Sequence, residues 1–281
     1  MMESTLSWEE AVLWLREQPD QQDLVNFCYY DDPLGDAAQR FHRSEEWAAT
    51  RELLRNYLPG KVLDLGAGRG IASYAFARDG CEVTALEPDP SPIVGRGAIN
   101  QLARQFKLPI STVEAYGEKL PFPKDQFDIV YGRAVLHHAK DLQNHCFEIH
   151  RVLRPRGAVL WIREHVISKP SDRQVFLANH PLHSLYGGEN AFLLEEYAAA
   201  IINSGLRLRR IIGPLENAVN YYPSTKADVI NAVTDKLAGR LGKLPARAIM
   251  TCPLLQRLAI RLVSRRSKIP GRHFSFLGTK V

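Results

Sequence analysis

The sequence predicts an α/β fold: a mostly parallel sheet of seven strands with helices on both faces and a cap of helices and loops. From Lys61 onward, short apolar runs of strand length alternate with segments whose apolar residues recur at helical spacing. Alternation of this kind favours a parallel sheet covered on both faces, because each crossover between parallel strands takes a helix. The 281 residues, 45% hydrophobic and 24% charged, have the composition of an ordinary globular protein.

The predicted elements follow one another in a regular order. Residues 61–66 and 81–88 carry the first two strands, and the helical segment 69–80 lies between them. These three segments form a β-α-β unit. The other predicted strands cover residues 110–116, 127–134, 158–165, 207–214 and 273–281, and the other predicted helices cover residues 91–106, 141–154 and 193–205.

Three segments do not follow the alternation and are expected to be additions to a core. The core is expected over residues 46–215, with residues 273–281 as its final strand. The additions are an N-terminal helical cap at 1–45, an insert at 166–191 and a basic helical insert at 216–272. Ligands of open α/β sheets bind beyond the carboxyl ends of the parallel strands, where two of these segments leave. We therefore expect the additions to roof the substrate site, with the insert at 166–191 on the substrate side.

Basic residues are concentrated near the C-terminus. The formal net charge is +5, and residues 236–281 hold eleven Lys and Arg but no Asp or Glu, which we interpret as a local basic surface. Apolar runs are far shorter than the roughly 20 residues that cross a bilayer, and the start of the chain is polar and acidic, so we expect a cytoplasmic protein. The 4 cysteines lie far apart without a Cys-x-x-Cys pair, which argues against a disulfide framework or a thiolate zinc site.

The first predicted strand runs into a glycine-rich turn and then a helix. Such a turn offers bare backbone and a helix N-terminus to a close-packed ligand. A dinucleotide-binding turn would place a third glycine where Ile71 stands, and the Gly-Lys-Ser/Thr ending of a phosphate-binding loop is absent. The turn alone is also explained as a tight strand-to-helix connection that needs only backbone freedom.

Five motifs in order over about residues 46–165 resemble the class I S-adenosylmethionine-dependent methyltransferases of the type 11-like group. They are the acidic-x-Gly-x-Gly-x-Gly turn at 64–70, Glu87 at the end of the second strand, and the segments 116–122, 127–138 and 151–157. The resemblance implies a Rossmann-like fold and S-adenosyl-L-methionine as cofactor. It further implies that the carboxylate of Glu87 accepts hydrogen bonds from the two ribose hydroxyls.

The same resemblance implies a set of cofactor-binding residues. They are Asp64, Gly66, Gly68, Gly70, Glu87, Pro88, Tyr116, Gly117, Glu118 and Arg133. Two positions depart from the family pattern: Arg156 stands where a second glycine is usual, and Tyr116 stands where many relatives carry an acidic residue toward adenine. We therefore expect backbone groups to hold adenine, with Glu118 or Glu114 as the candidate acid.

Histidines gather in the predicted site. His138 follows the fourth strand and His165 ends the fifth, so both are candidate bases, since the ordinary pKa of imidazole suits proton transfer at neutral pH. Histidines in such loops also commonly hydrogen-bond the backbone without a catalytic role. A metal site from His165, His180, His183 and Glu164 is conceivable, but the spacing is a weak signal and no metal is predicted.

Polar residues at the end of the fifth strand and in the following insert are candidate substrate ligands. They are Arg163, Glu164, His183, Tyr186 and Asn190. Charged and amide groups of this kind orient hydroxyl-rich molecules, which favours a small polar or sugar-like acceptor. A loop whose polar residues satisfy its own backbone is the alternative.

The segment 253–266 is predicted to be a basic amphipathic helix. Leucines recur at helical spacing beside a stripe of arginines: Leu254, Leu255, Leu258 and Leu262, with Arg257, Arg261 and Arg265. Such helices most often pack their apolar face on their own domain. Peripheral contact with an anionic membrane or a lipid-linked acceptor is the alternative hypothesis, and nucleic acid is disfavoured because the body of the chain is acidic.

These observations predict an enzyme that methylates a small-molecule acceptor, with oxygen as the expected acceptor atom. Two alternatives remain open at this stage. One is carbon methylation of a lipid or quinone-like molecule, and the other is a non-catalytic protein that binds the cofactor and a partner.

Overall fold

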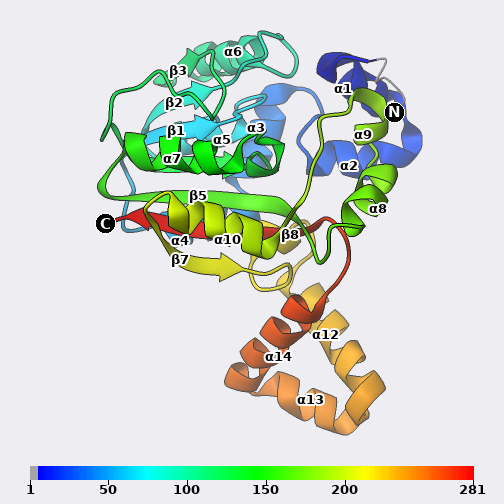
Figure 1. Ribbon diagram of the computed structural model, residues 1–281. Helices are drawn as coiled ribbons and strands as arrows, with labels where there is room; N and C mark the ends of the chain where they lie inside the picture. Colours follow the sequence, from blue (N-terminus) through cyan, green and yellow to red (C-terminus); the bar gives the residue numbers. More distant parts are fainter. Residues whose placement is uncertain (1–5) are drawn as a thin grey trace.

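The computed structural model describes residues 6–281 and has one central sheet in the order β3-β2-β1-β4-β5-β8-β7, with the short β6 beside β5 (Figure 1). The strands are β1 (Lys61–Leu65), β2 (Glu82–Leu86), β3 (Ile110–Val113), β4 (Phe127–Arg133), β5 (Leu153–Ile167), β6 (Phe192–Leu193), β7 (Leu206–Ile212) and β8 (Arg272–Lys280). All pairs are parallel except those of β8, which runs antiparallel to both β5 and β7. The predicted mostly parallel α/β sheet is therefore confirmed, with β6 as an additional two-residue strand.

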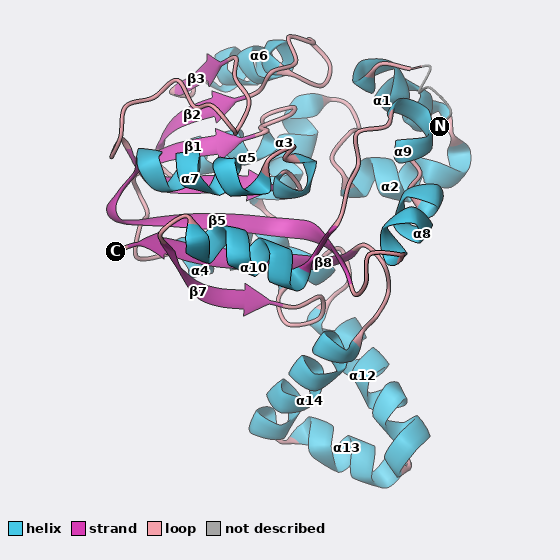
Figure 2. Cartoon of the chain, in the orientation of Figure 1, coloured by secondary structure: helices cyan, strands magenta, loops and turns pink. Residues whose placement is uncertain are grey.

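Helices cover both faces of this sheet. The helices of the N-terminal segment and the core are α1 (Trp8–Glu17), α2 (Gln22–Phe27), α3 (Leu34–His42), α4 (Glu45–Leu54), α5 (Ile71–Arg78), α6 (Arg96–Phe106), α7 (Leu142–Val152) and α10 (Leu194–Asn203). The other helices are α8 (Asp172–Asn179), α9 (His183–Tyr186), α11 (Ala218–Tyr221), α12 (Lys226–Leu241), α13 (Lys243–Thr251) and α14 (Pro253–Arg266), with short 3-10 turns η1 (Pro19–Gln21) and η2 (Leu136–His138). Figure 2 shows α7 and α10 in front of the sheet.

Alternation along the strands divides the core into two layers. Ile129 and Tyr131 of β4 pack with Trp47 and Phe76 on the α3–α5 side, whereas the intervening Val130 packs with α7 and α10 on the other side. Successive side chains of a strand point to opposite faces, so a central strand covered on both faces is apolar throughout. This explains why the core strands appear in the sequence as continuous apolar runs.

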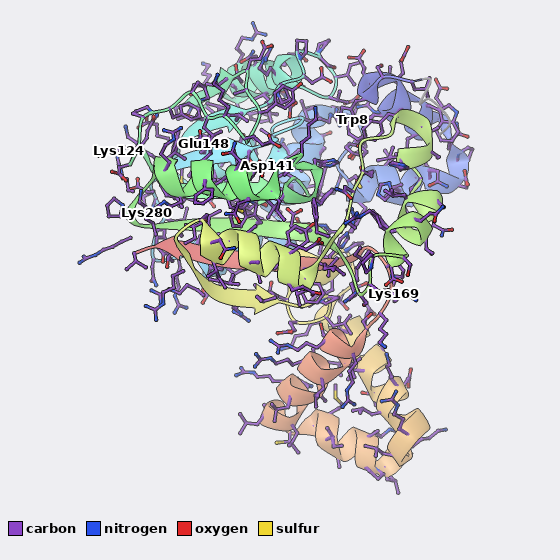
Figure 3. The ribbon with its side chains drawn as sticks, in the orientation of Figure 1. Trp8, Lys124, Asp141, Glu148, Lys169 and Lys280 are labelled. Atoms are coloured by element: carbon purple, nitrogen blue, oxygen red, sulfur yellow. The ribbon has the colours of Figure 1, made fainter. Side chains whose placement is uncertain are left out.

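The N-terminal helices and the segment after β5 meet at the end of the sheet where β5 leaves for α8 (Figure 1). Leu15 of α1 and Val25 of α2 form a buried cluster with Leu182, just before α9. Trp8 lies against Tyr186 with ring centroids 4.7 Å apart, and Figure 3 shows Trp8 at this junction. The cap and the insert are thus held together by their own apolar contacts.

Helices α12–α14 extend away from the sheet as a separate arm (Figure 1). The arm has its own small core, in which Val233 of α12, Met250 of α13 and Ala259 of α14 are buried. The expected packing of the α14 leucines on the domain is wrong: they are exposed, at 71%, 45%, 56% and 54% for Leu254, Leu255, Leu258 and Leu262. The face of α14 that turns inward carries Ala259 and Ser264 instead.

Among residues 6–281, no helix combines the length and the apolar character that crossing a bilayer requires.

Candidate active site

The glycine-rich turn follows β1 and leads into α5. Gly66, Gly68 and Gly70 all have φ in the left-handed region, at +56°, +52° and +81°, where residues with a Cβ are strained. A Cβ at Gly66 would lie 2.5 Å from the side chain of Val135, so this glycine is also required by packing. A Cβ at Gly68 would meet nothing closer than 3.9 Å. The turn therefore presents open backbone at Gly68.

Glu87 stands directly beside this open backbone. Its carboxylate accepts hydrogen bonds from the backbone N–H of Gly68 at 2.8 Å and of Asp89 at 2.9 Å. Burial raises the pKa of Glu87, and these two hydrogen bonds oppose the rise. Each carboxylate oxygen has a further lone pair, so the group retains the capacity to accept two hydrogen bonds from a diol.

Asp64 lies beneath the turn. Its side chain is buried and accepts a 2.6 Å hydrogen bond from the hydroxyl of Ser73 on α5. Burial raises the pKa of Asp64 to about 7 despite this hydrogen bond. The hydrogen bond of Asp64 therefore joins β1 to α5. Ionisation of this buried carboxyl group destabilises the folded protein.

The turn predicted to face adenine lies between β3 and β4. Tyr116 is 68% exposed, and Gly117 packs against the ring of His145. Glu118 accepts a 2.8 Å hydrogen bond from the backbone N–H of Lys140. The ring nitrogens of buried His145 have no hydrogen-bond partner within the described chain. The sequence analysis missed His145, whose position within an amphipathic helix gave no signal.

Other predicted cofactor-side residues have partners within the protein. Pro88 follows Glu87, and its carbonyl accepts a hydrogen bond from Arg96 at 3.3 Å. The other candidate acid, Glu114, forms an ion pair with the same Arg96 at 2.6 Å. These contacts tie the end of β2 to α6 and β3.

Arg133, predicted to bind the cofactor, and Arg163, predicted to bind the substrate, both lie beside a buried carboxylate on α4. Glu46 pairs with Arg133 at 2.7 Å and with Arg163 at 3.7 Å. Arg163 also stacks over the ring of Phe27 at 4.4 Å and donates a hydrogen bond to the carbonyl of Tyr222 at 2.9 Å. The structure thus gives both arginines a role in fixing the cap to the ends of β4 and β5.

A β-bulge in β5 orients the residues that follow Arg163. The pairing of β5 with β8 shifts between Trp161 and Glu164, and Arg163 has φ +62°. Bulges of this kind bend a strand and change the direction of its side chains. Beyond the bulge, Glu164 pairs with Phe274 and His165 with His273.

Glu164 is fully buried and holds the loop after β4. Its two oxygens accept the backbone N–H groups of Val135, Leu136 and His137 at 2.9–3.2 Å. The ring Nδ1 of His137 donates a fourth hydrogen bond at 2.8 Å. Glu164 was predicted to bind the substrate, but its two oxygens accept these four hydrogen bonds from the loop after β4.

Three imidazoles surround one carboxylate oxygen in front of Glu164. Oε2 of Glu189 lies 3.4, 4.0 and 3.9 Å from Nε2 of His137, His165 and His180. Burial lowers the pKa of His137, but the hydrogen bond to Glu164 and the nearby carboxylate of Glu189 outweigh it and raise that pKa to about 9. Burial raises the pKa of Glu189, but the neighbouring imidazoles, His137 first among them, lower it overall.

The remaining predicted residues lie around this cluster. His138 is exposed, and its Nδ1 donates a hydrogen bond to the carbonyl of Gly188 at 2.9 Å. Tyr186 donates a 2.8 Å hydrogen bond to Glu189, while the side chain of Asn190 accepts one from its own neighbour Ala191. His183 donates its backbone N–H to Nδ1 of His180 at 3.3 Å.

The cluster unites His165 and His180, which were both considered in the sequence analysis, with His137 and Glu189, which were not among the candidate site residues. His165, His183 and Tyr186 were candidate site residues, whereas Glu189 was not. Its only signal was its place after two glycines in the polar insert.

This chain is similar in sequence to known methyltransferases. A family model described as a methyltransferase domain matches residues 63–161. The malonyl-[acyl-carrier protein] O-methyltransferase of Enterobacter lignolyticus is 30% identical over 223 residues, which cover 78% of this chain and 80% of the relative. A ubiquinone biosynthesis O-methyltransferase of Pseudomonas putida is 29% identical over 184 residues, covering 62% of this chain and 74% of the relative.

The chain belongs to the class I S-adenosylmethionine-dependent methyltransferase family.

Solved structures of methyltransferases share the fold. An S-adenosylmethionine-dependent methyltransferase from Mesorhizobium loti superimposes with a TM-score of 0.55 at 19% identity, covering 85% of this chain and 99% of that one. A geranyl diphosphate methyltransferase in complex with S-adenosylmethionine gives 0.56 at 17% identity, covering 89% and 92%. Both likenesses concern the α/β architecture of this methyltransferase.

The residues around the turn fit S-adenosylmethionine as the cofactor of this methyltransferase. Open, left-handed backbone at Gly68 admits a ligand close to the chain. The acceptor-only carboxylate of Glu87 beside it matches the two donor hydroxyls of a ribose.

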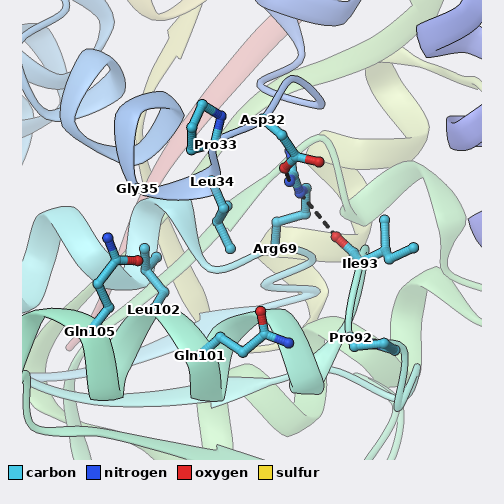
Figure 4. A pocket seen from close by; sticks show the side chains of 10 residues that line it. All are labelled: Asp32, Pro33, Leu34, Gly35, Arg69, Pro92, Ile93, Gln101, Leu102 and Gln105. Carbon is cyan, nitrogen blue, oxygen red and sulfur yellow. Dashed lines mark hydrogen bonds and ion pairs between the residues drawn. The ribbon is translucent and has the colours of Figure 1, made fainter.

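A separate cavity of about 420 Å³ lies on the α3 and α6 side of the turn. Figure 4 shows Arg69 in its wall between Asp32, with which it pairs, and Ile93, whose carbonyl accepts its 3.0 Å hydrogen bond. None of the site residues predicted from the sequence lines this cavity. It is therefore distinct from the imidazole cluster.

Replacing Asp64 with Asn tests the cost of the buried carboxyl. The pKa of Asp64 rises from 3.8 to about 7 on folding, so its stabilising contribution is complete below pH 3.8 and is lost as the pH rises through 7. Asn does not ionise, so Asp64→Asn should gain stability relative to the wild type as the pH rises. Between pH 5 and 8 that gain should grow by about 3 kcal/mol, measured by chemical unfolding. The exposed control Asp23→Asn should show no such trend, and a pH-independent difference for Asp64→Asn would contradict the burial account.

Proposed function

We propose that this methyltransferase transfers a methyl group to a hydroxyl oxygen of a small polar, sugar-like acceptor. The observation that carries the proposal is the contact between Val135 and Gly66, which puts the loop carrying His137 and His138 beside the cofactor turn. The acceptor would then lie between that turn and the polar insert. Named relatives that methylate oxygen, in ubiquinone biosynthesis and on malonyl-[acyl-carrier protein], support the choice of atom.

Different residues of this chain would bind the cofactor and accept the proton of the acceptor in such a transfer. S-adenosylmethionine, when bound, supplies an electrophilic methyl group on a sulfonium centre. Glu87 and the turn at Gly68 would hold the ribose, and much of the rate would come from positioning and exclusion of water. As the oxygen–carbon bond forms and the carbon–sulfur bond breaks, the hydroxyl proton must leave the acceptor. His138 would accept that proton at Nε2, because its Nδ1 already donates to the carbonyl of Gly188.

His165 fits the role of base less well. Its Nδ1 donates a 3.0 Å hydrogen bond to the carbonyl of Gly271, and its Nε2 faces Glu189 and not open space. Carbon methylation of a lipid or quinone-like molecule is the alternative reaction. It would need a largely apolar acceptor site, whereas the ring of His138 lies 4.2 Å from that of His137, which belongs to the imidazole cluster around the carboxylate of Glu189.

Replacing Glu87 with Ala should weaken binding of S-adenosylhomocysteine by at least several-fold, because two charge-assisted hydrogen bonds to the ribose are lost. Calorimetry with the purified protein measures the affinity. Glu82→Ala, at the exposed opposite end of the same strand, is the matched control and should bind like the wild type. Equal affinities for Glu87→Ala and wild type would refute the ribose assignment.

Replacing His138 with Gln should lower turnover by about 10²- to 10⁴-fold, the usual contribution of a general base. Turnover is measured as transfer of labelled methyl from S-adenosylmethionine to the hydroxylated glycoside that the wild type methylates best in a panel. The affinity for S-adenosylhomocysteine should stay within about twofold of wild type, since His138 would act in the chemical step only. Wild-type turnover would remove His138 from the mechanism.

We further propose that the α12–α14 arm contacts an anionic membrane surface. The four exposed leucines of α14 lie beside exposed Arg257, Arg261 and Arg265 on one side of the helix. The segment from 236 onward carries no acidic residue that would oppose anionic lipid. Apolar residues beside arginines suit a helix that lies in the interface of a bilayer.

Replacing Arg257, Arg261 and Arg265 together with Gln should abolish most sedimentation with vesicles that contain phosphatidylserine. Each arginine near such a surface contributes about 1 kcal/mol. The control replaces three exposed arginines of the body, Arg43, Arg104 and Arg207, with the same change of charge. If wild type does not sediment with anionic vesicles, or if both triple variants lose binding equally, the arm is not the membrane contact.

A further inference from the structure

His137, His165 and Glu189 converge on one point from three separate segments. One ligand atom of each lies within 4.8 Å of the other two, and Nε2 of His137 lies 3.4 Å from Oε2 of Glu189. A tetrahedral zinc ion with bonds of about 2.0–2.1 Å holds its ligand atoms about 3.3 Å apart. The side chains therefore need to close by less than about 1.5 Å to surround an ion.

Hydrogen bonds on the far side of each ring direct these nitrogens inward. Nδ1 of His137 faces the carboxylate of Glu164 at 2.8 Å, and Nδ1 of His165 faces the carbonyl of Gly271 at 3.0 Å. Both partners only accept hydrogen bonds, so both Nδ1 atoms carry their proton. When both rings are neutral, as binding of a metal ion requires, each Nε2 presents a lone pair toward Glu189. Carboxylate and carbonyl partners of this kind are the usual supports of histidines that bind metals.

Glu189 is oriented from its other oxygen. Oε1 accepts the 2.8 Å hydrogen bond from Tyr186, whereas Oε2 is buried and has no hydrogen-bond partner within the described residues. A buried carboxylate oxygen without a hydrogen-bond partner is unfavourable unless a positive charge lies beside it, on a metal ion or, in the absence of metal, on the ring of His137. The arrangement is thus incomplete without a positive charge.

The charge balance of the cluster also calls for a cation. Glu164 is fully buried and the side chain of Glu189 is 7% exposed, and in residues 6–281 neither forms an ion pair with lysine or arginine. Their two negative charges equal the charge of one divalent ion when the imidazoles are neutral. A single proton on His137 would leave one negative charge unbalanced.

We propose that His137, His165 and Glu189 bind a divalent transition-metal ion, of which Zn²⁺ is the reference case. Two imidazoles and a carboxylate, without thiolate, suit Zn²⁺ and similar ions. Three protein ligands leave a fourth position for water or for an oxygen of the acceptor.

His180 completes the surroundings as a hydrogen-bond donor. Its Nε2 lies 3.9 Å from Oε2 of Glu189, while its Nδ1 accepts the backbone N–H of His183. The neutral ring therefore carries its proton on Nε2, on the side of Glu189, where it could donate to an oxygen bound beside the ion. In the proposed methyl transfer, on which this step rests, the ion would lower the pKa of a bound acceptor hydroxyl.

Binding of metal alone tests the site without any acceptor. The full chain, free of purification tag and treated with chelator, is titrated with Zn²⁺ by calorimetry and with Co²⁺ by visible absorption. We expect one ion per chain, cobalt bands of a low-coordinate site, and a higher melting temperature with Zn²⁺. If the wild type binds neither ion, the proposal is overturned, and a proton on His137 alone balances Glu189.

Two ligand variants and a matched control separate this site from surface histidines. Glu189→Gln and His165→Gln should each weaken Zn²⁺ binding by more than about 10-fold, since even outer-shell partners contribute 10- to 100-fold. Glu195→Gln, an exposed glutamate in the first turn of α10, should bind like the wild type. Melting in the absence of metal shows whether each variant is folded. Folded variants that bind Zn²⁺ with wild-type affinity would refute the site, whatever the outcome for methyl transfer.

Discussion

The hydrogen bonds of one buried carboxylate organise the functional end of this protein. Glu164 extends from β5 and accepts three backbone N–H groups and one imidazole N–H from the loop after β4. Without these donors a carboxylate at this depth would be strongly destabilising, so the loop conformation and the glutamate require each other. The same loop presses Val135 against the glycine turn and aims His137 at Glu189. Cofactor turn and imidazole cluster are thus positioned by a single interaction.

A second buried carboxylate connects the N-terminal helices to the same end of the sheet. Glu46 on α4 pairs with Arg133 at the end of β4 and with Arg163 in the bulge of β5. Removing one member of such a buried group typically costs about 3–5 kcal/mol, because the remaining charge is left unpaired. The arginines therefore connect the N-terminal helices to the strands that carry the site. A charged residue beside an active site can stabilise the fold as well as bind a ligand. Arg163 is an example, since its contacts lie within the protein.

Much of the fold could be predicted because its signals are local. Strand-length apolar runs and the glycine turn depend on neighbouring residues, and Glu87 follows from its place at the end of a strand. The imidazole cluster could not be predicted, because it depends on a bulge at Arg163 and on an insert that returns over the sheet. Glu189 has no spacing relation to His137 or His165. The exposed leucines of α14 were also missed, since periodicity identifies an apolar face but not what covers it.

A crystal structure of the full chain with S-adenosylhomocysteine tests the account most directly. The account predicts the ribose hydroxyls on the carboxylate of Glu87, the backbone of Gly68 against the ligand, and the sulfur directed toward the space in front of His138 and Glu189. It would be contradicted by a ligand whose ribose lies away from Glu87, or whose sulfur points away from the loop that Glu164 holds.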